Sequence, residues 1–130
     1  MTKDPKITAA LIYDFDGTLA PGNMQEYDFI PAVGQSNKEF WNDANSLAEQ
    51  QDADMTLTYM AKMLDAARSR KLSLRREAFQ ESGRNITLFP GVKEWFGRIN
   101  AYAAERGVRV LHYINSSGLK EMIEGTPIAG

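Results

Sequence analysis

The stretch LIYDFDGTL, residues 11–19, decides how this chain folds. It completes an apolar run, residues 7–13, that ends abruptly in two carboxylates, Asp14 and Asp16. In α/β sheets, ligands bind beyond the carboxyl ends of the strands, so reactive side chains are typically found where a buried strand ends. Side chains alternate along an extended segment, so both carboxylates face one cleft only if Phe15 points away and the chain turns. The glycine after Asp16 gives the backbone the freedom for that turn.

A second apolar segment, residues 108–114, follows the same pattern near the end of the sequence. It runs into Ser116, Ser117 and Gly118, after which we expect a short helix over residues 119–124. Backbone N–H groups at a helix start, with a serine hydroxyl beside them, suit a phosphate oxygen. The two strand ends therefore combine acidic groups with an anion-binding pattern.

Helices are expected between the two strands. Residues 20–37 contain proline and glycine breakers together with many apolar side chains, which predicts a packed loop. Ser36 and Glu39 form a capping-box pattern that opens a helix. A polar run at residues 50–53 separates this helix from a second one over residues 55–70, whose apolar side chains share one face.

Two further helices complete the excursion. Ser73 is expected to cap a short helix that ends near Gly83, and Pro90 precedes an amphipathic helix that ends at Gly107. Strand, helical excursion, helix and strand together predict a parallel βαβ unit. The first strand is apolar almost throughout, which predicts burial on both of its faces.

The six residues from Asp14 to Leu19, behind an apolar strand, resemble the first motif of the haloacid dehalogenase-like (HAD) hydrolases, most of which are magnesium-dependent phosphatases. The segment LFPGV at residues 88–92 and the strand-end serine, Ser116, are similar to later features of that family. The resemblance implies an α/β fold with a Rossmann-like core, whose parallel sheet is incomplete in this chain, and an inserted α-helical cap. We accordingly expect a first core strand and catalytic loop at 1–20, the helical cap at 21–87, and the core helix, second core strand and following helix at 88–130.

The resemblance also implies roles for individual residues. Asp14 is the nucleophile that becomes an aspartyl phosphate, and Asp16 protonates the leaving oxygen and later activates water. Ser116 holds a phosphoryl oxygen, while Ser117 and Gly118 shape the phosphate-binding turn. Asp14 and the Asp16 carbonyl bind Mg²⁺. The implied activity is hydrolysis of a phosphoric monoester, with a small phosphorylated metabolite as the substrate.

The chemistry of these residue types supports the same reading. A carboxylate is a poor nucleophile toward a phosphate dianion because both are negatively charged, and a divalent cation removes that repulsion. A second carboxylate close by serves as general acid and base, because the first charge favours its proton. Two aspartates one residue apart therefore fit phosphoryl transfer assisted by a metal.

The family pattern stops after the strand-end serine. The third motif of the family is a lysine that neutralises the phosphate, and the fourth is a pair of acids on a later strand; neither has a counterpart here. Lys120 follows the serine too closely for the lysine role, and Glu121 and Glu124 lie on a helix expected to run away from the cleft. We therefore expect the N-terminal portion of a longer phosphatase, completed by a missing C-terminal half or by a partner chain.

Three other features have an ordinary structural interpretation. The sole histidine, His112, lies mid-strand four residues before Ser116, about 13 Å from it by strand rise, and we interpret it as a sheet-face residue. The methionines of the second helix fit packing of the helical layer better than a substrate pocket; they are Met55, Met60 and Met63, with Tyr59 nearby. A basic cluster fits a solvated face better than an anion site; it consists of Arg68, Arg70, Lys71, Arg75 and Arg76.

Composition excludes several classes of protein. The chain has 130 residues, and its 15 basic against 17 acidic residues give a net charge of −2, so no basic field for nucleic acid is present. The absence of cysteine excludes a disulfide framework and thiolate metal sites. No apolar run approaches the ~18 residues of a membrane span, and the polar start contains no signal-peptide pattern, so we expect a cytoplasmic protein without membrane partners.

Three alternatives to the phosphatase interpretation stay open. An EF-hand calcium loop is weaker, because its further oxygen ligands and later glutamate do not follow Asp16. Dehalogenation, in which an aspartate attacks carbon without a metal, is disfavoured by the second acid and by the Gly-Thr-Leu that follows it. A non-catalytic module that binds a phosphate ligand or another protein is the main competitor.

Overall fold

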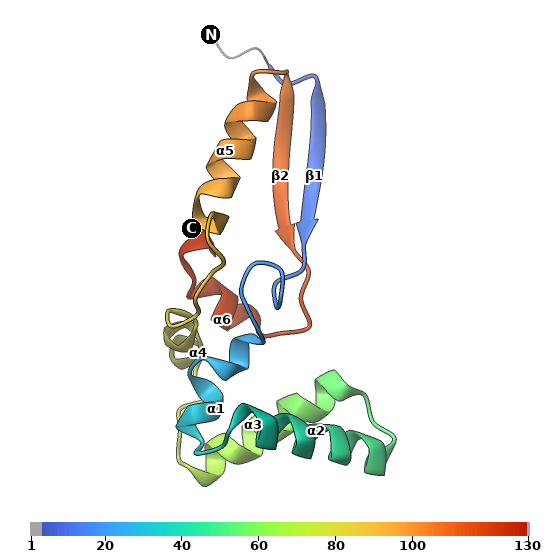
Figure 1. The fold of residues 1–130 in the computed structure, drawn as a ribbon, viewed down its shortest axis with the longest axis vertical. Coiled ribbons are helices and arrows are strands. Elements are labelled where there is room, and N and C mark those ends of the chain that lie inside the picture. The colour runs from blue at the N-terminus through green and yellow to red at the C-terminus, as the bar shows by residue number, and fades with distance from the viewer. Residues whose placement is uncertain (1–3, 130) are drawn as a thin grey trace. The chain divides into compact units, whose positions relative to one another are not determined.

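The computed structural model describes residues 4–129, which divide into two compact units. The strand unit comprises the chain up to Gly22 together with residues 87–116, and the helical unit comprises residues 23–86 and the chain from Ser117 onward. Within residues 4–129 the fold is mixed α/β, with six α-helices and one two-stranded parallel sheet, which confirms the predicted α/β class (Figure 1). The elements are β1 (Ile7–Tyr13), η1 (Met24–Glu26), α1 (Phe29–Ala32), α2 (Asn37–Gln51), α3 (Met55–Ser69), α4 (Arg76–Gly83), α5 (Val92–Ala104), β2 (Val108–Ile114), α6 (Lys120–Glu124) and η2 (Pro127–Ala129).

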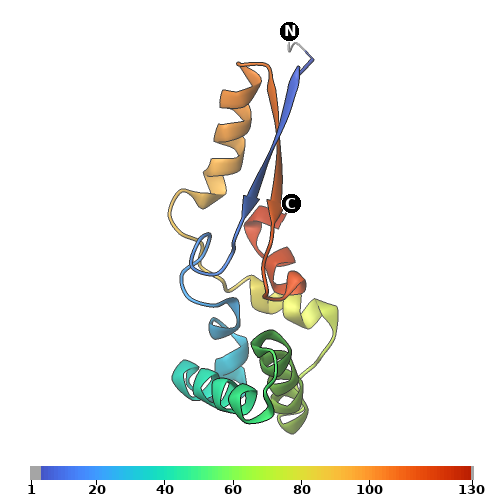
Figure 2. The same ribbon diagram turned by 90° about the vertical axis from the view of Figure 1, so that its right-hand side faces the viewer.

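Two strands far apart in the sequence build the sheet of the strand unit. β1 and β2 run parallel, in a register that pairs Ile7 with Val108 and Tyr13 with Ile114. Both strands have the bounds that their apolar runs predict. Helix α5 lies along one face of the sheet (Figures 1 and 2), where the ring of Phe96 meets the ring of Tyr13 edge-on with 5.5 Å between centroids. This contact ties the covering helix to the end of β1.

The other face of the sheet is exposed. Ile12 of β1 is 69% exposed, and its register partner Tyr113 of β2 is 53% exposed. Because side chains alternate along a strand, this pair lies on the face opposite Tyr13 and α5. The prediction that β1 is buried on both faces is wrong, since the single helix α5 covers only one of them.

Local capping sets the limits of the two longest helices in the helical unit. The Ser36 hydroxyl accepts the N–H of Glu39 at 3.1 Å, and the Glu39 carboxylate accepts the N–H of Ser36 at 3.3 Å, which confirms the predicted capping box of α2. Asp52 adopts the left-handed conformation, with φ of 48°, and ends that helix. Asp54 then caps α3 by accepting the N–H of Leu57 at 3.0 Å. The polar run between the two helices is therefore a tight turn.

The core of the helical unit is aromatic and aliphatic. The Trp41 ring lies edge-on between two others, 5.1 Å from Phe40 and 5.8 Å from Tyr59 by ring centroids. The buried apolar residues of this unit are Met24, Phe29, Ile30, Val33, Phe40, Ala44, Tyr59, Met63, Ala67, Ile86 and Met122. Within residues 4–129, every helix is too short or too polar to cross a lipid bilayer.

Two segments of this unit refine the sequence predictions. Residues 20–37, expected as a packed loop, contain the short helices η1 and α1, and the burial of Phe29 and Ile30 confirms the packing. Helix α4 begins at Arg76, so the prediction that Ser73 caps it is wrong. The Ser73 hydroxyl instead accepts the N–H of Arg75 at 3.3 Å and closes a turn within the connection.

Two glycines let α4 and α6 pack backbone against backbone. A β-carbon on Gly83 would lie 1.9 Å from the carbonyl oxygen of Met122, and one on Gly125 would lie 1.9 Å from the carbonyl oxygen of Gln80. Both positions are too crowded for any side chain. From the sequence, α6 is expected in the segment that follows the second strand; in the structure it packs on α4 within the helical unit.

We predict that Gly83→Ala destabilises the protein by about 1–3 kcal/mol, because the added methyl group overpacks this contact. Gly97→Ala is the matched control. Gly97 lies within α5 with no atom near its potential β-carbon, so this substitution should stabilise the helix by up to about 1 kcal/mol. Urea unfolding followed by circular dichroism gives both values, and equal effects would contradict the close packing of α4 and α6.

Glu124 links α6 to α4 through polar contacts. Its Oε2 accepts Gln80 Nε2–H at 2.8 Å and lies 3.9 Å from Arg76 Nη1, while its Oε1 lies 3.6 Å from Lys120 Nζ. The hydrogen bond from Gln80, aided by the charges of Lys120 and Arg76 and opposed by partial desolvation, lowers the pKa of Glu124 from its ordinary value of 4.5. A lowered pKa means that this contribution to stability is complete above the unfolded-state pKa and is lost as pH falls through the folded-state value.

We predict that Gln80→Met raises the pKa of Glu124 toward 4.5, because the substitution removes the amide donor and keeps the length of the side chain. The variant should be less stable than the parent at neutral pH, and this difference should shrink as pH falls through the acid range. Carboxyl carbon NMR of Glu124 measures the pKa, and urea unfolding across the acid range measures the stability. Gln51→Met, at the exposed end of α2, is the control and should leave both curves unchanged.

Candidate functional site

Asp14 follows β1 at the carboxyl end of the sheet, and its side chain is exposed. Its Oδ1 accepts the N–H of Phe15 at 2.9 Å, which orients the carboxylate at the strand end. Phe15 is fully buried, and Asp16 beyond it is half-buried. The two acids therefore flank a side chain that points into the protein, as the alternation of the sequence predicts.

The loop after Asp16 is closed by its own backbone. The Phe15 carbonyl accepts the N–H of Thr18 at 3.1 Å and the N–H of Leu19 at 2.9 Å. Gly17 donates its N–H to the Ala20 carbonyl at 2.7 Å. Its φ of 76° lies in the left-handed region that favours glycine, which confirms the turn predicted at this position. The chain thus bends back immediately beyond the two carboxylates.

The end of β2 lies beside the end of β1. The Asn115 N–H donates to the Tyr13 carbonyl at 2.8 Å, which extends the ladder by one residue. Ser116 comes next and is half-buried. Paired strands are about 4.8 Å apart, so Asp14 and Ser116 leave the sheet from the same edge on neighbouring strands. The structure therefore brings Asp14, Asp16 and Ser116 to one end of the strand unit.

Ser117 and Gly118 belong to the helical unit. The Tyr59 hydroxyl donates to the Ser117 carbonyl, and the N–H of Leu119 donates to the Met24 sulfur at 3.1 Å. Helix α6 has five residues, and the N–H of its N-cap residue Leu119 is bonded within the helical unit, so the predicted phosphate site at this helix start stays a prediction. The phosphate-binding role of Ser117 and Gly118 stays a prediction.

The donor set at the sheet end is compatible with magnesium. Mg²⁺ is commonly held by one or two carboxylates, with water and substrate phosphate completing its octahedron. Asp14 and Asp16 can supply oxygen ligands of this kind. Within residues 4–129, no cluster of three or more histidine, cysteine or acidic side chains has the geometry of a metal site. With Asp14 and Asp16 as the only protein ligands, we expect Mg²⁺ to bind weakly unless a phosphate ligand is also present.

A hydrogen-bonded chain of four side chains supports the end of β1. Trp95 Nε1–H donates to the Tyr13 hydroxyl at 2.9 Å, and that hydroxyl lies 2.9 Å from His112 Nδ1. His112 Nε2 lies 2.7 Å from Asn100 Oδ1. Both ring nitrogens thus have partners within the strand unit, which agrees with the interpretation of His112 as a sheet-face residue. Because Tyr13 immediately precedes Asp14, the chain of bonds fixes the backbone from which the candidate nucleophile projects.

Other charged candidates lie elsewhere. Lys120 is 81% exposed and pairs with Glu124, and both lie on α6 in the helical unit. All five residues of the basic cluster, which runs from the last turn of α3 to the first residue of α4, are exposed, as a solvated face requires. Sequence reasoning missed the contact between Tyr13 and His112. The sequence indicates it only indirectly, because both residues lie on strands that are expected to pair.

Comparison with known proteins returned no match: no family model fits the chain, and no curated protein or solved structure is similar to it. The resemblance to the HAD hydrolases therefore depends on the motif residues themselves. The strongest of these is the uninterrupted run from Asp14 to Leu19, followed by the strand-end Ser116.

We predict that the neutral form of the His112 ring carries its hydrogen on Nε2. Asn100 Oδ1 only accepts hydrogen bonds, so Nε2 must donate, and Nδ1 then accepts from the Tyr13 hydroxyl. A long-range ¹H–¹⁵N spectrum of the sole histidine identifies the tautomer. Tyr13→Phe should leave the tautomer unchanged, alter the Nδ1 shift and cost about 1 kcal/mol of stability. Observation of the Nδ1–H tautomer would refute this arrangement.

Proposed function

We propose that this chain serves the magnesium-dependent hydrolysis of small phosphoric monoesters, with its strand unit acting as part of a HAD-like core and its helical unit as the cap. The observation that carries the proposal is the parallel pairing of β1 and β2, which sets Asp14 and Ser116 at one edge of the sheet. Acidic and hydroxyl groups at that edge lie where α/β sheets bind ligands.

The proposed reaction has two steps. In the first, an Asp14 carboxylate oxygen attacks phosphorus, the bond from phosphorus to the ester oxygen breaks, and Asp16 gives its proton to the departing alcohol. In the second, Asp16 takes a proton from water, and the water oxygen attacks phosphorus and releases the Asp14 carboxylate. Ser116 donates its hydroxyl hydrogen to a phosphoryl oxygen throughout.

Each residue has a feature that suits its role. Asp14 is exposed at a strand end, so a phosphate ester can reach it in line. Asp16 is half-buried one residue beyond the buried Phe15, which places its carboxyl group at the same strand end as Asp14 for proton exchange with the leaving alcohol and with water. A bound Mg²⁺ supplies the positive charge that lets an anionic nucleophile approach a phosphate dianion. Asp14 and the Asp16 carbonyl are the groups proposed to hold it.

We predict that the complete protein releases p-nitrophenol from p-nitrophenyl phosphate in the presence of Mg²⁺, and that Asp14→Asn lowers the rate by at least about a thousandfold. The substitution keeps the shape of the side chain and removes the nucleophilic charge. Asp65→Asn, on the exposed face of α3, is the matched control and should retain the parental rate. EDTA should abolish the activity of both the parent and the control.

The second candidate function is a non-catalytic module that binds phosphate esters or another protein. The exposed pair Ile12 and Tyr113 favours it, because apolar side chains on an open sheet face are suited to contact with a partner. Saturable binding of p-nitrophenyl phosphate without release of p-nitrophenol would select this module over the enzyme. Turnover that survives Asp14→Asn would exclude the proposed mechanism.

A further inference from the structure

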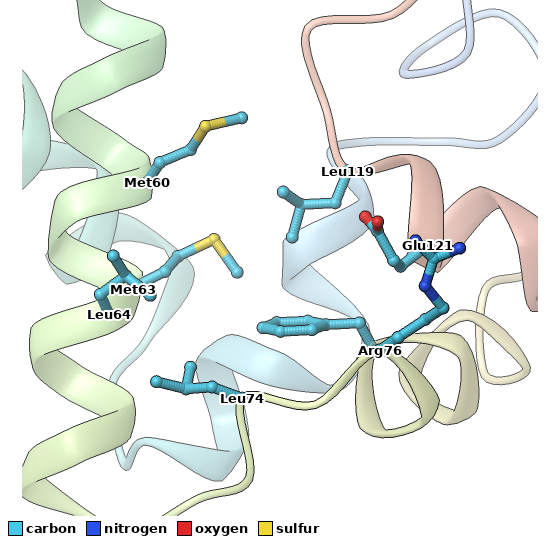
Figure 3. A pocket seen from close by; sticks show the side chains of 8 residues that line it. Met60, Met63, Leu64, Leu74, Arg76, Leu119 and Glu121 are labelled. Carbon is cyan, nitrogen blue, oxygen red and sulfur yellow. The ribbon is translucent and has the colours of Figure 1, made fainter.

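The helical unit contains a cavity of about 440 Å³ (Figure 3). Its walls come from α3, from the connection to α4, from α4 itself and from the start of α6. This volume lies within the range of small-molecule sites in proteins. The lining residues are Met60, Met63, Leu64, Leu74, Arg76, Phe79, Leu119 and Glu121. We infer that this cavity binds an uncharged small molecule that has an apolar body and one hydroxyl group.

The apolar body follows from the walls. Six of the eight lining side chains are apolar, and in Figure 3 Met60 and Met63 point across the cavity toward Leu119, while Leu74 extends toward α3. Leu64 is 42% exposed and Leu74 is 37% exposed, so large apolar surface faces the open space. Methionine side chains adapt their shape to an irregular partner. A ligand that fills the cavity would cover this surface.

The cavity is held open by bonds that require no ligand. The Tyr59 hydroxyl on α3 donates to the Ser117 carbonyl just before α6, which ties two of the walls together. The N–H of Leu119 donates to the Met24 sulfur at 3.1 Å, which fixes the start of the α6 wall. The close packing at Gly83 fixes α6 against α4. The site is therefore largely preformed, which lowers the entropic cost of binding.

The hydroxyl group follows from the charges at one end. Arg76 and Glu121 both line the cavity (Figure 3), and they offer it a donor and an acceptor. Next to them, Glu124 lies 3.6 Å from Lys120 and 3.9 Å from Arg76. The positive charges of Lys120 and Arg76 therefore balance the negative charges of Glu121 and Glu124. A hydroxyl can accept from the guanidinium and donate to Glu121. A carboxylate ligand would have no hydrogen to donate to Glu121 and would add an unpaired negative charge to a set whose charges already balance.

The volume also limits the size of the occupant. Two turns of helix, about 11 Å long and 10 Å wide, need roughly 850 Å³, so a peptide helix does not fit. Because a water-sized group takes about 30 Å³, the cavity holds roughly ten to fifteen non-hydrogen atoms. A small alcohol or phenol meets both limits. None of the lining residues belongs to the site around Asp14 and Ser116, so this inference stands apart from the proposed phosphatase activity.

The test is a titration of the full chain with 4-butylphenol, observed through ¹³C-labelled methionine methyl groups. The methyl signals of Met60 and Met63 should shift saturably. The signal of Met55, on the same helix but outside the cavity, should not. 4-Butylbenzoate, of similar shape but negatively charged, should bind at least about tenfold more weakly. Asp14→Asn should bind 4-butylphenol as the parent does.

Leu64→Gln and Leu57→Gln form a matched pair of variants on α3. Leu57 is 69% exposed and lies outside the cavity, so both substitutions should leave the helix folded, as circular dichroism can verify. Leu64→Gln should weaken binding of 4-butylphenol about tenfold, and Leu57→Gln should leave it unchanged. The inference fails if Met60 and Met63 do not respond, if Met55 shifts equally, or if the two variants bind alike. Equal affinity for 4-butylbenzoate overturns the assigned ligand class.

Discussion

The parallel pairing of β1 with β2 is the interaction on which the candidate site depends. Asp14 and Ser116 are separated in sequence by the whole of the segment 23–86, and only the ladder brings them to one edge of the sheet. The cost of closing such a long loop grows slowly, by about 0.6 kcal/mol for each doubling of its length. A folded helical unit can therefore occupy the connection without preventing the strands from pairing. The ladder itself is completed by α5, which buries one face through Tyr13 and Phe96.

Much of the local structure could be predicted from the sequence because its causes are local. Continuous apolar runs define both strands to the residue, and the Ser36–Glu39 capping box opens α2 where expected. The turn beyond Asp16 was predictable because Gly17 is the residue that tolerates a positive φ. The same local pattern placed Asp14 and Ser116 at strand ends, so the positions of the main candidate residues followed from the sequence alone.

The features that sequence reasoning missed depend on contacts between distant segments. Burial of Ile12 would require a second layer of structure on the open face of the sheet. An apolar run in the sequence does not reveal whether one face or both faces of the sheet are covered. Gly83 and Gly125 resemble ordinary helix ends in the sequence, and only the structure shows that each allows the backbones of α4 and α6 to touch. The methionines of α3 illustrate a further limit. The sequence presents packing and cavity lining as alternatives, whereas Met63 is both 3% exposed and part of a cavity wall.

The chain has two tryptophans, and each unit contains one of them. Trp41 is half-buried between the rings of Phe40 and Tyr59, whereas Trp95 is 41% exposed and donates its indole hydrogen to Tyr13. Such different surroundings give the two indoles distinct emission. Every unit thus carries a built-in fluorophore, and replacing either indole by phenylalanine isolates the signal of the other. The order in which the two units melt is consequently accessible to fluorescence without any added label.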